Sequence, residues 1–252
     1  MSWLSTFTLS GSAQDLNESA AIEHIQRTRS WLMTYIALVT SLLAFFILII
    51  SMIEIEGSSL KRDHQKLTQA IYMDVKAAVA DQSIDWLQVE NTLTKGVRIS
   101  IKPNLIRNQN LFASAQAKIN PRYLPYLQSL AEVLQQVDIE ALRQRYMKLV
   151  SSIEANGFDV KMMIRIEGHT DAHPLAQTAR FKNNIELSTF RAYAMMDWLR
   201  IHLPLTRSHF VIAGYGSFQP ILDDVYAADN RRIEIYIQPM LKQQRELAGT
   251  IL

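Results

Sequence analysis

The chain has 252 residues and no cysteine, which excludes disulfides and thiolate metal sites. Its 26 Lys and Arg stand against 24 Asp and Glu, so no overall attraction to nucleic acid is expected. The length suffices for one or two domains with a packed core.

The first strong feature in chain order is an apolar stretch at residues 31–53, which follows a short polar tail at 1–30 with room for a small helix near 15–28. Its 23 residues, WLMTYIALVTSLLAFFILIISMI, include no charged residue, proline or glycine. A helix of this length spans about 35 Å, enough to cross the hydrocarbon core of a membrane. We therefore predict a single membrane-spanning helix. Lys and Arg are nearly balanced on its two sides, so charge does not decide its orientation.

A linker at residues 54–96 is predicted to be helical. Leu67, Ile71, Val75 and Ala78 recur at helical spacing and define one apolar face. Two uses of this face remain open, pairing with a second copy of the helix or lying on the membrane surface.

The segment that follows begins a folded domain, expected at residues 97–239. Alternating apolar residues at 97–101 predict a strand. Asn120 and Pro121 are typical of a helix start. A second helix is expected over 139–153, ended by Asn156 and Gly157. We interpret the apolar stripe within residues 138–156 as core or as a self-association face.

The rest of the domain contains four further elements. Residues 159–168 read as a strand, 186–203 as a helix, and 209–216 and 231–239 as two more strands. The order β-α-β-α-β-β predicts an α+β sandwich of helices on one sheet, followed by a tail at 240–252.

The stretch GHTDAHP, residues 168–174, raises the question of a metal site. His169, Asp171 and His173 occupy alternate positions, which on an extended chain point the same way. Three such side chains are suitable zinc ligands. No further ligand stands at a recognisable spacing, so we favour no metal, with His169 a structural residue and His173 an exposed one.

Four separated motifs carry a resemblance to a known family. IEGHTDAHP, NNIELSTFRAYAMMDWL, AGYGSFQPI and NRRIEIYI resemble, in this order, the motifs of the OmpA-like peptidoglycan-binding domain. The spacing from Asp171 to Asn184 is similar to that of the MotB branch of stator subunits. The membrane stretch agrees, because Trp31, Tyr35 and Thr40 fall where MotB-like subunits carry the same residues.

The resemblance implies that Asp171 and Arg191 hold the diaminopimelate of the cell-wall stem peptide. The chemistry fits, because a zwitterion needs an anion for its ammonium group and a cation for its carboxylate. Asn184 is expected to fix the loop, either by capping the helix or by hydrogen bonding to the ligand, and free backbone N–H groups are expected near 186–188. Of the two arginines in NRR, one is expected to support the site and the other to be a solvated strand charge. The expected peptidoglycan-binding residues are Asp171, Arg191, Asn184, Thr170, Leu187, Ser188, Arg231 and Arg232, with no metal, no cofactor and no catalytic residue.

One departure from the family lies in the membrane stretch. MotB-like subunits keep one aspartate there, which carries the ion that drives the motor, because a charged group inside a membrane is retained only for function. Aligned on the shared residues, that position here is Ala37. Ala37, Ser41 and Ala44 form a stripe of small residues, a pattern typical of close helix packing.

The resemblance implies a single-pass protein of the bacterial inner membrane, with a cytoplasmic N-terminus and a periplasmic domain. It also implies a homodimer and a MotA-like multi-span partner. Two functions remain open. The first is the wall-anchoring subunit of a motor complex, for flagellar rotation or anti-phage defence. The second is a purely structural anchor that ties a membrane assembly to the cell wall without ion conduction. An enzyme is disfavoured because no nucleophile–base constellation emerges.

Overall fold

The computed structural model describes residues 9–92, 94–102, 105 and 111–243; the side chains of residues 9–21, 23–28, 30 and 53–58 lie outside this description. The chain divides into two compact units, Met1–Ser59 and Leu60–Leu252.

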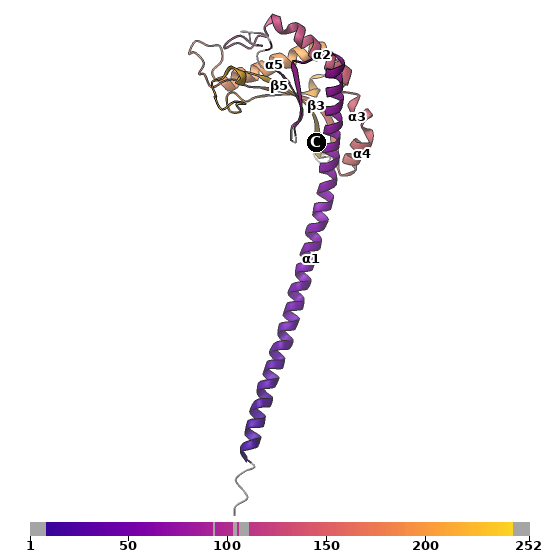
Figure 1. The fold of residues 1–252 in the computed structure, drawn as a ribbon, viewed down its shortest axis with the longest axis vertical. Helices are drawn as coiled ribbons and strands as arrows, with labels where there is room; N and C mark the ends of the chain where they lie inside the picture. Colours follow the sequence, from indigo (N-terminus) through magenta and orange to yellow (C-terminus); the bar gives the residue numbers. More distant parts are fainter. Residues whose placement is uncertain (1–8, 93, 103–104, 106–110, 244–252) are drawn as a thin grey trace, which may run out of the picture. The chain divides into compact units, whose positions relative to one another are not determined.

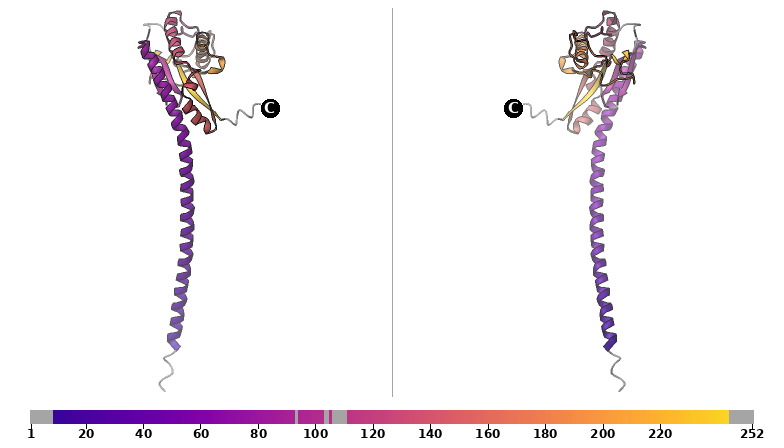
Figure 2. Two further views of the ribbon diagram at one scale, coloured as in Figure 1. Left: turned by 90° about the vertical axis from the view of Figure 1, so that its right-hand side faces the viewer. Right: turned by 90° about the vertical axis from the view of Figure 1, so that its left-hand side faces the viewer.

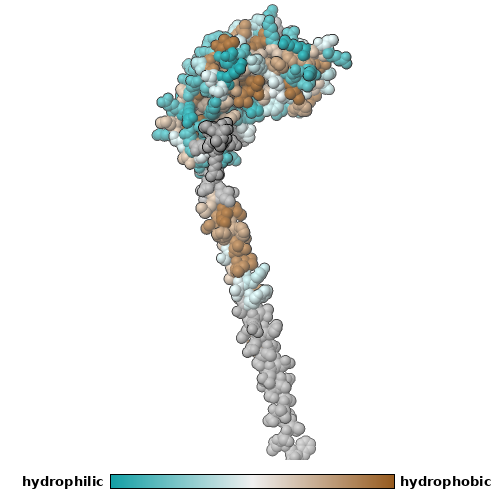
Figure 3. All heavy atoms as spheres, turned by 180° about the vertical axis from the view of Figure 1, so that it is seen from behind, coloured by the Kyte–Doolittle hydropathy of each residue, from teal (hydrophilic) through white to brown (hydrophobic). Residues whose placement is uncertain are grey.

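The first unit consists of helix α1, which runs over Leu9–Asp81 and continues into the second unit. Trp31–Met52 is long and apolar enough to cross a membrane, and none of it is buried. Figure 3 shows this stretch as a brown band on the helix. The predicted apolar helix is confirmed. The small helix considered near 15–28 is part of α1, which is helical from Leu9 onward, so the tail is helical over more of its length than expected.

The second unit is built on a five-stranded sheet of order β1-β2-β5-β3-β4. Its long central strands β3 and β5 run antiparallel and side by side (Figures 1 and 2), whereas β3 and β4 are parallel. The strands are β1 (Leu87–Thr92), β2 (Gly96–Ile101), β3 (Phe158–Gly168), β4 (Phe210–Gly214) and β5 (Ile233–Gln243).

Helices α4 and α5 both pack on β3, which confirms the α+β fold class. The expected helix over 139–153 is divided at Tyr146, whose φ of −105° and ψ of 30° are not helical. It ends as predicted, with Asn156 as C-cap and Gly157 at φ +85°. The helices are η1 (Pro121–Tyr123), α2 (Leu124–Val137), α3 (Leu142–Arg145), α4 (Met147–Ala155), α5 (Asn184–His202), η2 (Arg207–His209) and η3 (Ala228–Asn230).

The linker prediction needs correction, because the last part of α1 belongs to the folded domain. Leu67, Ile71 and Val75 are completely buried and join the same core cluster as the apolar residues of α3 and α4. Polar contacts reinforce this packing, as the Ser152 hydroxyl donates to Asp63 at 2.5 Å. The apolar face therefore neither pairs with a copy of itself nor lies on a membrane. The compact unit begins at Leu60 rather than at residue 97.

Strand β1 was also missed and lies within the expected linker. It pairs antiparallel with β2, from Leu87 opposite Ile101 to Thr92 opposite Gly96. At the other end, β5 continues to Gln243, so residues 240–243 of the expected tail are strand. The rest of that tail lies outside the described residues.

Candidate functional site

The candidate site lies where β3 ends and α5 begins. The chain leaves β3 at Gly168, and the next residues are joined to the loop after β4, because Thr170 N donates to Gly216 O at 2.9 Å. Ala172 N donates to Val225 O at 3.0 Å in the same way. The loop that carries Asp171 is thus held on both sides of this residue by backbone hydrogen bonds.

Asp171 is only 7% exposed, and its carboxylate is already paired. Oδ2 accepts a hydrogen bond from Arg231 Nη1 at 2.7 Å and lies 3.2 Å from His173 Nδ1. Oδ1 accepts from the backbone N–H of His173 at 3.3 Å. The predicted carboxylate therefore meets a guanidinium group of the NRR motif.

Arg191 comes from the second turn of α5 and is 4% exposed. Burial lowers the pKa of Arg191 to about 10, and the positive charge of Arg231 adds to this effect while Asp171 opposes it. The structure thus brings the predicted pair Asp171 and Arg191 together with Arg231, within electrostatic reach of one another.

A segment that sequence reasoning missed covers Arg191. Its Nε donates to Gln116 O at 3.0 Å and its Nη2 to Ala113 O at 3.2 Å, and its guanidinium lies 5.3 Å from the centre of the Phe112 ring. This segment lacks the periodic apolar pattern of a helix or strand, so the sequence offered no signal for it.

The start of α5 differs from expectation in its cap. The N-cap is Asn183, whose side chain accepts from Glu186 N at 2.8 Å, and Leu187 N donates to Asn183 O at 3.0 Å. These two N–H groups, which were expected to be free, are therefore engaged. Asn184 fixes the loop, because its side-chain amide donates to Asp171 O at 3.2 Å and to His173 O at 2.9 Å.

Three other predicted residues lie beneath the loop rather than on its surface. Leu187 is 2% exposed and Ser188 is fully buried, where its hydroxyl accepts from Gly216 N at 2.9 Å. Thr170 is 3% exposed, and its hydroxyl has no hydrogen-bond partner among the described residues. Their positions support the loop from below.

The three residues of the NRR motif make different contacts. Asn230 is completely buried and organises the preceding loop, accepting from Ile221 N at 2.9 Å and donating to Asp224 O at 2.9 Å. Arg231 contacts Asp171, whereas Arg232 pairs with Glu234 at 2.8 Å. Arg232 is therefore not the solvated strand charge that the sequence allowed for.

The metal alternative finds no support in the positions of His169, Asp171 and His173. His169 is 1% exposed and stacks on Tyr215, with ring centres 5.4 Å apart. The side chain of His173 is 61% exposed and contacts Asp171. His173 and Asp171 therefore contact each other, whereas His169 packs against Tyr215, so the three side chains do not converge on one metal position.

A different trio, Glu167, His169 and Glu234, does lie close enough to hold an ion, with ligand atoms within 4.8 Å of one another. Both carboxylates are already neutralised by basic side chains, and these disfavour an added cation. The basic partners, at 2.6 to 3.1 Å, are Lys95 and Arg165 for Glu167, and Arg98 and Arg232 for Glu234.

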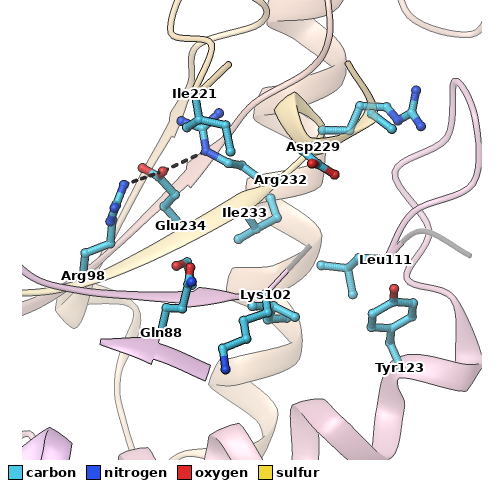
Figure 4. A pocket seen from close by; sticks show the side chains of 14 residues that line it. Gln88, Arg98, Lys102, Leu111, Tyr123, Ile221, Asp229, Arg232, Ile233 and Glu234 are labelled. Atoms are coloured by element: carbon cyan, nitrogen blue, oxygen red, sulfur yellow. Dashed lines mark hydrogen bonds and ion pairs between the residues drawn. The ribbon is translucent and has the colours of Figure 1, made fainter. Parts of the chain in front are cut away.

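Glu234 is the most strongly perturbed acid of this buried network. Burial alone would raise its pKa, but contacts with His169, Tyr236 and Arg232 lower the pKa of Glu234 far below its ordinary value of 4.5. Figure 4 shows Arg98 and Arg232 converging on its carboxylate.

Comparisons with known proteins agree with both units of the chain. Residues 17–71 match the family model described as membrane MotB of the proton-channel complex MotA/MotB. The uncharacterized protein YtxE of Bacillus subtilis (strain 168) is 25% identical over 242 residues, which cover 84% of this chain and 90% of that protein.

Among solved structures, the putative MotB-like protein from Desulfovibrio vulgaris shares the fold, with a TM-score of 0.52 at 17% identity. The match covers 72% of this chain and 99% of that one. The periplasmic domain of Helicobacter pylori MotB is 22% identical with a TM-score of 0.44, covering 66% of this chain and 89% of that one.

Trp31–Met52 is long and apolar enough to cross a membrane, and the second unit is an α+β domain. The chain is thus similar to MotB proteins in two parts: its apolar N-terminal helix lies in the segment that matches the MotB family model, and its second unit shares the fold of the MotB-like protein.

The buried network makes a prediction about acid stability. The folded state keeps Glu234 ionised below pH 4.5, whereas the unfolded chain protonates it, so the stabilisation is present above pH 4.5 and lost as pH falls. The free energy of unfolding, measured by denaturant titration in detergent micelles at pH 7, 5 and 3, should therefore fall with pH. In Glu234→Gln it should be lower by about 3–5 kcal/mol at pH 7 and fall less on acidification.

Glu132→Gln, an exposed carboxylate on α2, is the matched control and should retain the wild-type pH profile. An unchanged pH dependence in Glu234→Gln would contradict the assignment.

Proposed function

We propose that the domain binds peptidoglycan without a covalent bond, through the diaminopimelate of its stem peptide. The observation that carries the proposal is the nearly buried Asp171 carboxylate with the guanidinium groups of Arg191 and Arg231 beside it. A carboxylate suits the ammonium group of the ligand, and guanidinium groups suit its carboxylates.

The pairing of Asp171 with Arg231 favours a zwitterion over a simple cation or anion. A ligand ammonium group can replace Arg231 on Asp171, while a ligand carboxylate takes the released Arg231. This exchange leaves no charge buried without a partner, and an unpaired buried charge costs several kcal/mol. A ligand with a single charge would leave either Asp171 or Arg231 uncompensated.

Arg191 supports the same ligand from the helix side. Two of its donor nitrogens are directed to the carbonyls of residues 113 and 116, and Nη1 has no hydrogen-bond partner among the described residues. A guanidinium held in this way keeps a fixed orientation, which reduces the entropy lost on binding a carboxylate.

The first functional prediction concerns binding to peptidoglycan of the cell wall. The full chain in detergent micelles should co-sediment with purified peptidoglycan, and Asp171→Ala or Arg191→Ala should abolish this. Each substitution leaves an opposite charge without its partner, at a cost of about 2–5 kcal/mol. Asp223→Ala and Arg207→Ala, at exposed positions, are the controls and should bind normally. Binding that survives the first two substitutions but disappears with EDTA would favour a metal instead.

We further propose that the protein crosses the inner membrane once, with its N-terminus in the cytoplasm and its domain in the periplasm. Support comes from the apolar helix Trp31–Met52 and from the ligand, which lies outside the inner membrane. The numbers of Lys and Arg on the two sides do not require this orientation.

A reporter fused after Leu252 tests the orientation. An enzyme that is active only in the periplasm should be active in this fusion, and one that is active only in the cytoplasm should be silent. The reverse pattern would remove the proposed ligand from reach of the domain and overturn the peptidoglycan proposal with it.

Two functions remain for the assembled protein. In the first it is a homodimer that works with a MotA-like partner in a motor complex, and in the second it is a purely structural anchor. The described span, Trp31–Met52, contains no Asp, Glu, His, Lys or Arg, and Ala37 stands at the position that the resemblance aligns with the family's aspartate. The Thr40 hydroxyl lies 2.9 Å from Ile36 O and 3.0 Å from Ala37 O, so its hydrogen is used within the helix. We therefore favour an anchor that conducts no protons through an aspartate-type site.

A measurement of proton flux distinguishes the motor subunit from the structural anchor. Expressed with a MotA-like partner under an imposed proton gradient, the wild type should not acidify the cytoplasm beyond the partner alone, because no group at position 37 titrates. Ala37→Asp should introduce a leak, and Ala37→Asn, which has similar shape but does not titrate, should not.

Glu54 and Glu56 follow the span, and their side chains lie outside the described residues. Strong wild-type flux that disappears in a Glu54→Gln/Glu56→Gln double variant would contradict the anchor function and favour the motor.

A further inference from the structure

A cavity of about 210 Å³ is lined in part by Arg231, the residue that pairs with Asp171 in the candidate site. It lies between the ends of β2 and β5, the 3₁₀ turn η3 and the residues around Tyr123, all within the second unit. Arg231 lines this cavity and at the same time contacts Asp171 at 2.7 Å. The two sites therefore share one guanidinium group.

The lining of the cavity is positive. Four of its side chains are basic and two are acidic. One of the acids, Glu234, is already neutralised by Arg98 at 3.1 Å and Arg232 at 2.8 Å. The basic residues are Arg98, Lys102, Arg231 and Arg232, and the other acid is Asp229. Arg98 also pairs with Glu90, and Arg231 pairs with Asp171. Among the described residues, Lys102 is therefore the basic side chain of this lining that has no carboxylate partner and can receive an anionic group.

The opposite wall is apolar. Figure 4 shows Leu111 and Tyr123 across the cavity from Arg98 and Glu234, with Ile233 between them. A water molecule occupies about 30 Å³ in the liquid, so the cavity has room for a small group of several heavy atoms. The combination of charge and apolar wall suits a carboxylate attached to a short aliphatic group.

We propose that this cavity is a second subsite, which binds a peptide's terminal alanine through its carboxylate and methyl group. The inference rests on the proposed function, because it places diaminopimelate between Asp171 and Arg191. Successive residues of an extended peptide lie about 3.3–3.6 Å apart. Because Arg231 lines the cavity and also contacts Asp171, the residue attached to the diaminopimelate is the part of the stem peptide that we expect in the cavity.

The test compares two soluble fragments of peptidoglycan, a disaccharide with a tripeptide stem that ends in diaminopimelate and one with a tetrapeptide stem that ends in alanine. Both carry the same number of carboxylates, so the comparison isolates their position. Calorimetry on the full chain in micelles should give a Kd about tenfold lower for the tetrapeptide, the effect of one charge-assisted hydrogen bond.

Two variants locate this difference in the cavity. Ala228→Trp, at an exposed position on its rim, should raise the Kd of the tetrapeptide to that of the tripeptide and leave the tripeptide unchanged. Lys102→Gln should weaken only the tetrapeptide, by several-fold, because it removes one positive charge from the lining. Ala176→Trp and Lys148→Gln, at exposed positions outside the cavity lining, are the matched controls and should change neither Kd.

The outcomes separate this inference from the function on which it rests. Equal affinity for both fragments, unaffected by Ala228→Trp, would overturn the alanine subsite while binding lost in Asp171→Ala still supported the main site. Failure of the wild type to bind either fragment would overturn the proposed function itself. Competition by inorganic phosphate that removes the preference for the tetrapeptide would show a general anion site and would also overturn the assignment to alanine.

Discussion

The close approach of α5 to the sheet is the constraint on which the site depends. A Cβ atom at Gly168 would meet the backbone oxygen of Ser188, and one at Gly214 would meet Thr189, both closer than real Cβ atoms come to other atoms. Only glycine at these two strand ends lets the first turns of the helix rest on the strands. Asp171 follows Gly168 by three residues and Arg191 follows Ser188 by three, so this contact determines how far apart the two charges lie.

The elements with a strong periodic pattern could be predicted from the sequence. β3, β5 and α5 were expected close to their observed positions, because their buried faces repeat with the period of a strand or helix. β1 was missed because an edge strand with few buried residues has little pattern: Leu87 is its single buried residue. The apolar face of α1 was recognised, but amphipathicity shows that a face is covered and does not show by what.

The same limit applies to the site. Asp171 and Arg191 could be named from the motif, and their proximity followed from the resemblance to OmpA-like domains. Asp171 pairs with Arg231 and not with Arg232. This choice depends on the direction in which each of the two side chains points just before β5 begins, which the sequence motif does not give. The covering of Arg191 by residues 112–116 depends on backbone carbonyls, which every residue carries and no sequence pattern reveals.

The burial of Leu67, Ile71 and Val75 has a consequence for how this domain can be moved between proteins. The apolar residues of α3 and α4 share their core cluster with a helix that lies before residue 81, far ahead of the motifs by which the domain is recognised. A gene fusion or natural recombination that joined at residue 97 would leave this part of the core facing water. The transferable module starts near Leu60, so it carries with it a piece of the helix whose earlier part is long and apolar enough to cross a membrane.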